Sequence, residues 1–183
     1  MNKIEIEIPD GKVAKWVNGV LTLVDDTPPK DVRDRIKTFE DACTELGDEH
    51  PLVAQYKLIT GAYKGKEKTD DIIAYLKLRI ICEALNEGWV PTFDDGKYRY
   101  YPWLCMYTKE EYDKFDEEHK THCVPLRSHY SAVASGGLVY AYAGFAGSYS
   151  SSNFGVRLAF KTPELAKYCG KQFIDIWEKF LFA

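Results

Sequence analysis

The sequence predicts an α+β fold, with a mostly antiparallel sheet, a helical block and a C-terminal helix packed on the sheet. Three observations predict this class. The first residues alternate apolar and polar side chains, the middle of the chain repeats apolar residues at helical spacing, and the region from Trp89 onward combines aromatic residues with turn signals. With 183 residues, 45% of them hydrophobic, the chain can bury one core without disulfide bonds.

A small β element is expected over residues 1–26. Residues 3–8 alternate charged residues with isoleucine, which indicates a half-buried strand. Two further apolar runs, VAKWV and VLTLV, flank the dipeptide Asn18-Gly19. Asn-Gly is a strong hairpin signal, because both turn residues must accept positive φ. We therefore expect three strands, followed by an α+β main domain over residues 27–183.

A helical block is expected over residues 30–88. The first helix, within residues 31–46, ends at Gly47. Its apolar face carries Val32, Ile36, Phe39, Cys43 and Leu46. A second, weaker helix covers about residues 51–63.

The third helix of the block is the strongest. Thr69-Asp70-Asp71 provides its N-cap and an acidic first turn, and Gly88 ends it. Its expected inward side chains are Ile72, Ile73, Leu76, Ile80, Ala84 and Leu85.

A β-rich part is expected over residues 89–161. Residues 89–108 are aromatic and β-like, and Thr108 with Glu111 forms a capping box for a short polar helix over residues 109–120. Two further strands are predicted, GLVYAYAGF and NFGVRLAF.

A C-terminal helix is expected over residues 162–182. Thr162 occupies the N-cap position and Pro163 the first helical position. The predicted buried stripe consists of Leu165, Cys169, Phe173, Ile176, Trp177 and Phe180.

One stretch stands out as a candidate contact surface. Residues 128–156 contain no Asp, Glu, Lys or Arg, in a chain that is 28% charged. Ser, Gly, Ala and Tyr make up 21 of these 29 residues. Tyr offers rigid contact area with a polar tip, and Ser, Gly and Asn offer adaptable hydrogen bonds, as in binding loops. We expect this stretch to bind a ligand or a partner.

The aromatic run over residues 98–107 has two interpretations. It can be a core strand with a solvated edge, or a stacking platform that faces the Tyr-rich stretch. Arg157 can be a buried structural arginine, which we favour, or an anchor for an anion. The candidate ligand-binding residues are therefore Tyr98, Tyr100, Tyr101, Trp103, Tyr130, Tyr140, Tyr142, Tyr149, Asn153 and Arg157.

The sequence indicates no catalytic residues, no metal site and no cofactor. His119, His122, Cys123 and His129 lie close together, but the paired spacing of zinc motifs is missing. The adjacent carboxylates at 94–95 and 117–118 fit solvated surface better than acid–base pairs. The motifs G-x-S-x-G, P-loop and HExxH are absent. An enzyme of unrecognised type stays an alternative.

Composition limits which classes of binding partner and which cellular compartment fit the chain. The net charge of −4 and a pI near 5.6 argue against nucleic-acid binding. Five widely spaced cysteines and the lack of a signal-like apolar segment favour free thiols in a reducing compartment. No apolar run is long enough to span a membrane. An exposed charge-free stretch would be a large apolar patch unless it were covered, so we expect self-association or a stable partner complex.

Several motifs carry a resemblance to a known group of proteins. RIKTFEDACTELG, ICEALNEGWVP and the C-terminal module VRLAFKTPELAKYCGKQF resemble an uncharacterised family common in bacteriophages and prophages of gut Bacteroidetes. The resemblance runs from about Arg35 to the end of the chain. It implies a phage or mobile-element origin, a location in the bacterial host cytoplasm or in the virion, and a phage or host partner. It assigns no catalytic or binding residue.

The order of elements is also similar to that in C-type-lectin-like domains of phage display proteins. From Thr121 to Phe160 the chain lacks Lys, Glu, Gln, Met and Trp. Adenine-directed diversification leaves such a signature. A Gly/Ser/Tyr-rich β region that avoids long charged side chains leaves it too, and we favour this second explanation. The function expected is non-catalytic binding of a sugar, a host surface molecule or a nucleotide signal; a virion structural or assembly component is the alternative.

Overall fold

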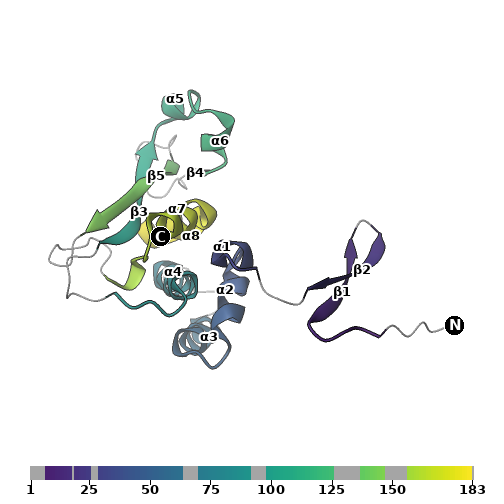
Figure 1. Ribbon diagram of the computed structural model, residues 1–183. Coiled ribbons are helices and arrows are strands. Elements are labelled where there is room, and N and C mark those ends of the chain that lie inside the picture. The colour runs from purple at the N-terminus through teal and green to yellow at the C-terminus, as the bar shows by residue number, and fades with distance from the viewer. Residues whose placement is uncertain are drawn as a thin grey trace.

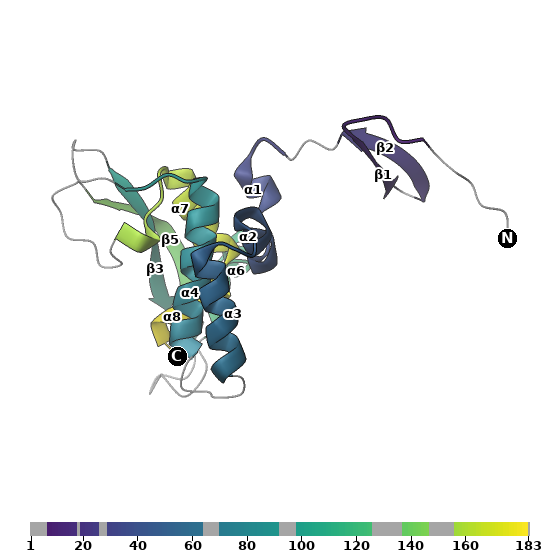
Figure 2. The same ribbon diagram turned by 90° about the horizontal axis from the view of Figure 1, so that it is seen from below.

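The computed structural model describes residues 7–17, 19–25, 29–63, 70–91, 98–125, 137–146 and 156–182. Helices and two small antiparallel sheets make up this part of the chain, as expected of an α+β protein (Figures 1 and 2). Helical residues outnumber strand residues in this part of the chain, so a sheet that makes up most of the fold is not supported, although every described strand pair is antiparallel. One reason is that Val156–Leu158 forms a 3-10 turn where a strand was predicted.

The N-terminal β element is a two-stranded hairpin. Strands β1 (Lys12–Val17) and β2 (Val20–Asp25) pair antiparallel, with Val17 opposite Val20. The turn contains Gly19 at a φ of 79°, the left-handed conformation that the Asn-Gly signal predicts. The predicted first strand falls mainly outside the described residues. The hairpin projects away from the helices (Figures 1 and 2).

The helical block begins with a break that the sequence pattern did not reveal. One predicted helix is observed as α1 (Val32–Arg35) and α2 (Phe39–Leu46). Thr38 starts α2 through a capping box with Asp41, and Ile36 is extended, so the chain turns between the two helices. Gly47 ends α2 at a φ of 84°, as predicted.

Two longer helices complete the block, α3 (Pro51–Tyr63) and α4 (Asp70–Asn86). Most of the predicted inward residues of α4 are buried, namely Leu76, Ile80, Ala84 and Leu85. Ile72 is 49% exposed, contrary to the prediction, whereas Ile73 is half-buried. Ile72 lies in the first turn of α4, where the helix is less covered than at Ile80 and Ile81, which are both fully buried.

The larger sheet has the strand order β3-β5-β4. Strand β3 (Arg99–Tyr107) pairs antiparallel with β5 (Gly137–Ala146), which pairs antiparallel with β4 (Cys123–Pro125). Between β3 and β4 lie α5 (Lys109–Tyr112) and α6 (Glu117–Lys120). The Thr108–Glu111 capping box is confirmed, but a second N-cap at Asp116 divides the predicted polar helix.

The C-terminal helix joins the sheet to the helical block. It is divided at Phe173 into α7 (Pro163–Gln172) and α8 (Ile174–Phe182), and Thr162 and Pro163 start it as predicted. Helix α7 packs on β3 and β5, while α8 packs on α4, which also contacts α2 and α3. Five of the predicted stripe residues are buried and Phe180 is half-buried. Trp177 has no exposed surface and lies in the core.

Candidate functional site

Two described parts of the predicted contact surface lie on neighbouring strands. Strand β3 carries the aromatic run 98–107 and lies beside β5, which contains Tyr140 and Tyr142. In the register, Trp103 is opposite Tyr142 and Leu104 is opposite Tyr140, with a bulge between Trp103 and Leu104. The candidate residues Tyr130, Tyr149 and Asn153 lie outside the described residues.

The aromatic run divides into exposed and buried members. Tyr98 is 55% exposed and Trp103 is 37% exposed, so both have surface accessible to solvent. Tyr101 and Tyr107 are each only 8% exposed. The ring of Tyr107 stacks on Tyr112 and meets Phe115 edge-on, with each pair of ring centroids 5.7 Å apart. The run therefore contributes both packing and surface residues.

Backbone hydrogen bonds between Tyr100 of β3 and Phe160 hold the segment over residues 156–160 in place. The N–H of Tyr100 donates to the carbonyl oxygen of Phe160 at 3.1 Å, and the N–H of Phe160 donates back at 2.7 Å. The neighbouring Ala159 carbonyl accepts hydrogen bonds from the Cys82 thiol at 3.1 Å and from the Asn86 amide at 2.8 Å. The segment 156–160 is thereby held between β3 and the C-terminal half of α4.

Arg157 lies on this segment and is exposed, so the favoured interpretation of a buried structural arginine is wrong. The 3-10 helix η2 (Val156–Leu158), which stands in place of the predicted strand, buries Leu158 and leaves Arg157 exposed.

Arg157 lines a pocket of about 260 Å³ together with Arg79 of α4. The floor contains Cys82, Asn86 and Ala159, and one wall is formed by Trp89, Val90 and Pro91. Arg79 and Trp89 are half-buried, and Val90 is 71% exposed. The pocket combines two guanidinium groups with an apolar wall.

A tight turn at the end of α4 positions that wall. Glu87 has a φ of 50° and Gly88 a φ of 79°, so both residues adopt the left-handed conformation. The N–H of Trp89 donates to the Asn86 carbonyl at 3.0 Å, which closes the turn. Adding a side chain to Gly88 would be strained at this φ even though the space around it is open.

Glu87 is held in this turn by two cations. Its carboxylate accepts from Arg35 at 2.8 Å and from Lys161 at 2.9 Å. These hydrogen bonds, that from Arg35 first, lower the pKa of Glu87. Lys161 also donates to the Asn86 carbonyl at 3.3 Å. A cation at the C-terminal end of a helix interacts favourably with the helix dipole, so Lys161 stabilises this end of α4.

The two pocket arginines differ from Arg35 in their partners. Within the described residues, neither Arg79 nor Arg157 has a carboxylate within salt-bridge distance; Arg79 lies 6.0 Å from the Tyr75 ring centroid. The one carboxylate of the lining, Glu83, is 3.1 Å from His50 Nε2. The pocket therefore has two guanidinium groups available for an anionic group.

The Cys82 thiol in the floor is not suited to act as a nucleophile. Burial raises the pKa of Cys82 well above its ordinary value, and Arg79 opposes this shift only weakly. The thiol donates to a carbonyl oxygen instead. Because thiolates and not thiols are nucleophilic, Cys82 has a packing and hydrogen-bonding role.

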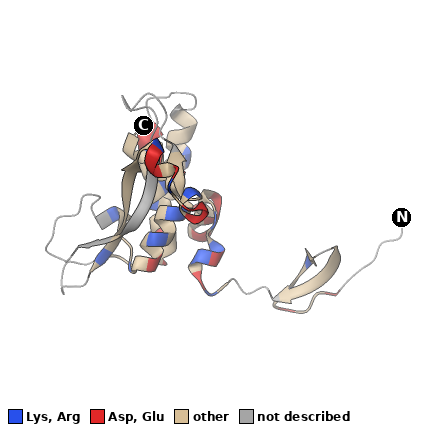
Figure 3. Cartoon of the chain, turned by 90° about the horizontal axis from the view of Figure 1, so that it is seen from above, with Lys and Arg blue, Asp and Glu red and all other residues tan. Residues whose placement is uncertain are grey.

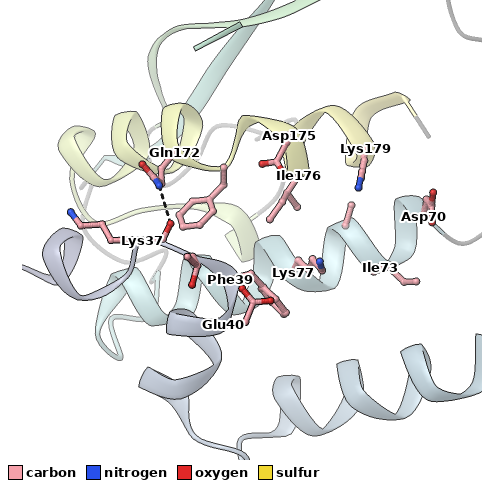
Figure 4. A pocket seen from close by; sticks show the side chains of 13 residues that line it. Lys37, Phe39, Glu40, Asp70, Ile73, Lys77, Gln172, Asp175, Ile176 and Lys179 are labelled. Carbon is pink, nitrogen blue, oxygen red and sulfur yellow. Dashed lines mark hydrogen bonds between the residues drawn. The ribbon is translucent and has the colours of Figure 1, made fainter. Parts of the chain in front are cut away.

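A second, larger hollow lies between α4 and α8 and extends to the start of α2 (Figure 4). Its volume is about 350 Å³, and Phe39, Ile73, Phe173 and Ile176 provide apolar surface. Lys37, Lys77 and Lys179 at its edge are balanced by Glu40, Asp70 and Asp175. Lys77 Nζ lies 4.8 Å from the centroid of the Phe39 ring. The balanced charges favour no particular ligand.

The histidine cluster has local partners. His119 Nδ1 lies 2.9 Å from Asp116, and the Cys123 thiol donates to the His119 carbonyl at 3.2 Å. Burial lowers the pKa of His122. In the part of the chain that the structure describes, no three His, Cys, Asp or Glu side chains are grouped to hold a metal ion. His129 lies outside that part.

Sequence reasoning identified Arg157 but missed Arg79, Trp89 and Asn86. Arg79 lies within α4, which was correctly predicted, Asn86 is its last residue, and Trp89 follows in the turn. Their role depends on the contact between α4 and η2, which are far apart in the sequence, and no local pattern indicates such a contact.

The described ranges contain no helix that is both long and apolar enough to cross a membrane. Comparison with protein-family models, with curated proteins and with solved structures finds no match to this chain.

Proposed function

We propose that the protein is a non-catalytic binding protein that takes an anionic ligand in the pocket between Arg79 and Arg157. The observation that carries the proposal is that these two arginines, from separate elements, line one pocket and lack carboxylate partners within the described residues. Guanidinium groups donate in a planar fork that matches carboxylates and phosphates.

The apolar wall of the pocket limits the classes of ligand that fit it. Trp89, Val90 and Pro91 offer an aromatic and aliphatic surface beside the two charges. Binding pockets commonly combine such apolar walls with a few polar groups that fix the orientation of the ligand. A flat ring attached to a phosphate or carboxylate satisfies both features. Of the ligands that the sequence suggests, a nucleotide signal fits this description best.

The exposed aromatic residues extend the proposed surface. Tyr98 and Trp103 lie on β3, which is joined to the Arg157 segment through the Tyr100–Phe160 bridge. We propose that they, together with the Tyr-rich stretch 128–156, contact the rest of a larger ligand or its carrier. The resemblance to phage proteins supports a phage or mobile-element origin.

A matched set of small probes tests the proposal. Phenyl phosphate carries both the ring and the anion, inorganic phosphate carries the anion alone, and phenol carries the ring alone. Two-dimensional ¹H–¹⁵N NMR of the full chain should show saturable shifts of the Trp89 indole N–H and of the backbone at residues 157–161. The expected order of affinity is phenyl phosphate, then inorganic phosphate, with phenol too weak to saturate.

Shifts elsewhere on the protein, or phenol binding as tightly as phenyl phosphate, would contradict an anion site at this pocket. A high-salt titration provides the control, because a charge-driven site weakens as ionic strength rises.

A further inference from the structure

Glu83 adds a carboxylate to the pocket that Arg79 and Arg157 line. Among the described residues of that lining it is the one acidic residue, and its side chain is 45% exposed. Arg79 and Glu83 are four residues apart on α4, so their side chains lie on the same face of the helix. A pocket that only holds an anion is weakened by a negative charge at this position, because like charges repel.

His50, which lies just before α3, holds this carboxylate in place. The N–H of Leu52 donates to Nδ1 of His50 at 3.4 Å, so the ring carries its proton on Nε2. Nε2 lies 3.1 Å from Oε1 of Glu83 and donates to it. In the described part of the chain the other oxygen, Oε2, has no hydrogen-bond or ion-pair partner. Glu83 therefore has one fixed oxygen and one oxygen that is available as an acceptor.

The individual charges of the lining decide which ligands the pocket favours. Acidic and basic positions are interspersed along the helices (Figure 3), so the helices provide no strong field of one sign. A ligand that is only an anion meets two favourable charges and one unfavourable charge in the lining. A ligand that also places a hydroxyl or an N–H near Glu83 replaces this repulsion with a hydrogen bond to a charged acceptor.

The position of Glu83 along the pocket limits where that donor must be. At 1.5 Å per residue, Glu83 lies about 6 Å along α4 from Arg79. Trp89 follows in the turn after the helix and also lines the pocket. The acceptor is therefore between a guanidinium group and an indole ring. The matching donor of a ligand lies between its anionic group and its flat ring.

We propose that Glu83 is a specificity-determining residue that accepts a hydrogen bond from a ribose hydroxyl of a ribonucleotide, an inference that rests on the proposed function. In a 5′-ribonucleotide the ribose connects the phosphate to the base, so its hydroxyls have the required intermediate position. Carboxylates bind ribose hydroxyls in the same way in dinucleotide-binding folds. The pocket volume of about 260 Å³ is just below the usual range of about 300–1,000 Å³, which favours one nucleotide unit over two.

Isothermal titration calorimetry of the full chain with adenosine 5′-monophosphate and its 2′,3′-dideoxy analogue tests this role. The two ligands share the base and the phosphate and differ only in the hydroxyls. The wild-type protein should bind the ribonucleotide at least fivefold more tightly. Glu83→Ala should bring the two affinities within twofold of each other. The matched control Glu110→Ala, which removes an exposed carboxylate on α5, should leave their ratio unchanged.

Phenyl phosphate provides a second measurement with the opposite sign. It has no donor for Glu83, so Glu83→Ala and Glu83→Gln should each bind it at least twofold more tightly than the wild type, because a repulsive charge is removed. Glu83→Gln also keeps an oxygen that accepts from His50, which controls for local rearrangement. Weaker binding of both phenyl phosphate and the ribonucleotide by these variants would indicate a merely structural role and overturn the inference.

The outcomes separate this inference from the proposed function. If phenyl phosphate binds the wild-type protein but the two nucleotides bind it equally well, the role of Glu83 is overturned and the anion site stands. A preference for the ribonucleotide that persists in Glu83→Ala also overturns this role. If phenyl phosphate does not bind, the proposed function fails and the inference fails with it.

Discussion

The side-chain amide of Asn86 donates a 2.8 Å hydrogen bond to the carbonyl oxygen of Ala159, 73 positions later in the chain. The amide oxygen accepts from the N–H of Lys161 at 3.0 Å. Asn86 is 3% exposed, and both of its polar atoms are paired. This one side chain attaches the segment carrying Arg157 to the helix carrying Arg79, and so it holds the candidate pocket together.

Asn86→Ala should therefore destabilise the protein by about 1–3 kcal/mol, because it leaves the N–H of Lys161 without its acceptor and the Ala159 carbonyl with only the Cys82 thiol as donor. Asn86→Asp keeps an acceptor for Lys161 but loses the donor to Ala159, so it tests the donor separately. Urea denaturation of both variants measures the change in the free energy of unfolding. A free energy of unfolding equal to that of the wild type in both variants would show that this contact does not join the two elements.

Trp177→Ala should cost about 3–5 kcal/mol, the usual range for removing a buried aromatic side chain. Trp177 has no exposed surface and packs against Phe180, with ring centroids 6.0 Å apart. Lys179→Ala on the exposed side of the same helix is the control, with a change within about 0.5 kcal/mol. Equal stabilities for the two variants in urea denaturation would contradict the assignment of Trp177 to the core.

Stability should fall as the solution becomes alkaline. Burial raises the pKa of the Cys169 thiol from 9.0 to about 12. Because the folded pKa is higher than the unfolded one, the thiol's contribution is complete below pH 9 and is lost as pH rises towards 12. Urea midpoints measured from pH 8 to pH 11 should decrease, and Cys169→Ala should show a smaller decrease. A midpoint that does not change up to pH 11 would refute this linkage.

Changing Tyr140, Tyr142 and Tyr149 together to Ser distinguishes recognition from packing. If these tyrosines form a contact surface, the melting temperature should remain nearly unchanged, while retention of a host-lysate ligand is lost. A matched triple change at exposed Lys109, Lys114 and Lys167 to Ser serves as the control. A strongly lowered melting temperature in the tyrosine variant alone would assign these residues to the core.

Local signals predicted the ends of most elements. Gly47, Gly88, Thr108 and Thr162 act through the conformation or hydrogen bonds of a single turn, and each ends or starts a helix as expected. The break before Thr38 was missed, although its capping box with Asp41 depends on the same kind of signal. Apolar periodicity continues across that break and concealed it.

Contacts between distant segments could not be predicted in this way. The apolar run ending at Phe160 resembles a strand, but Ala159 and Phe160 are bonded to α4 on one side and to Tyr100 on the other, and the preceding residues turn as η2. Arg157 is therefore exposed. In the sequence, Arg79 is only one charged residue on a predicted helix. It becomes a candidate binding residue because the contact between α4 and η2 brings it into the same pocket as Arg157.

The central claim is that Arg79 and Arg157 jointly bind an anion, and isothermal titration calorimetry with phenyl phosphate tests it most directly. Arg79→Gln and Arg157→Gln should each weaken binding at least tenfold. Arg33→Gln, which removes a charge that is paired with Asp31, should leave the affinity within twofold of the wild type. Full affinity in both the Arg79→Gln and the Arg157→Gln variants, or an equal loss in the Arg33→Gln variant, would contradict the account.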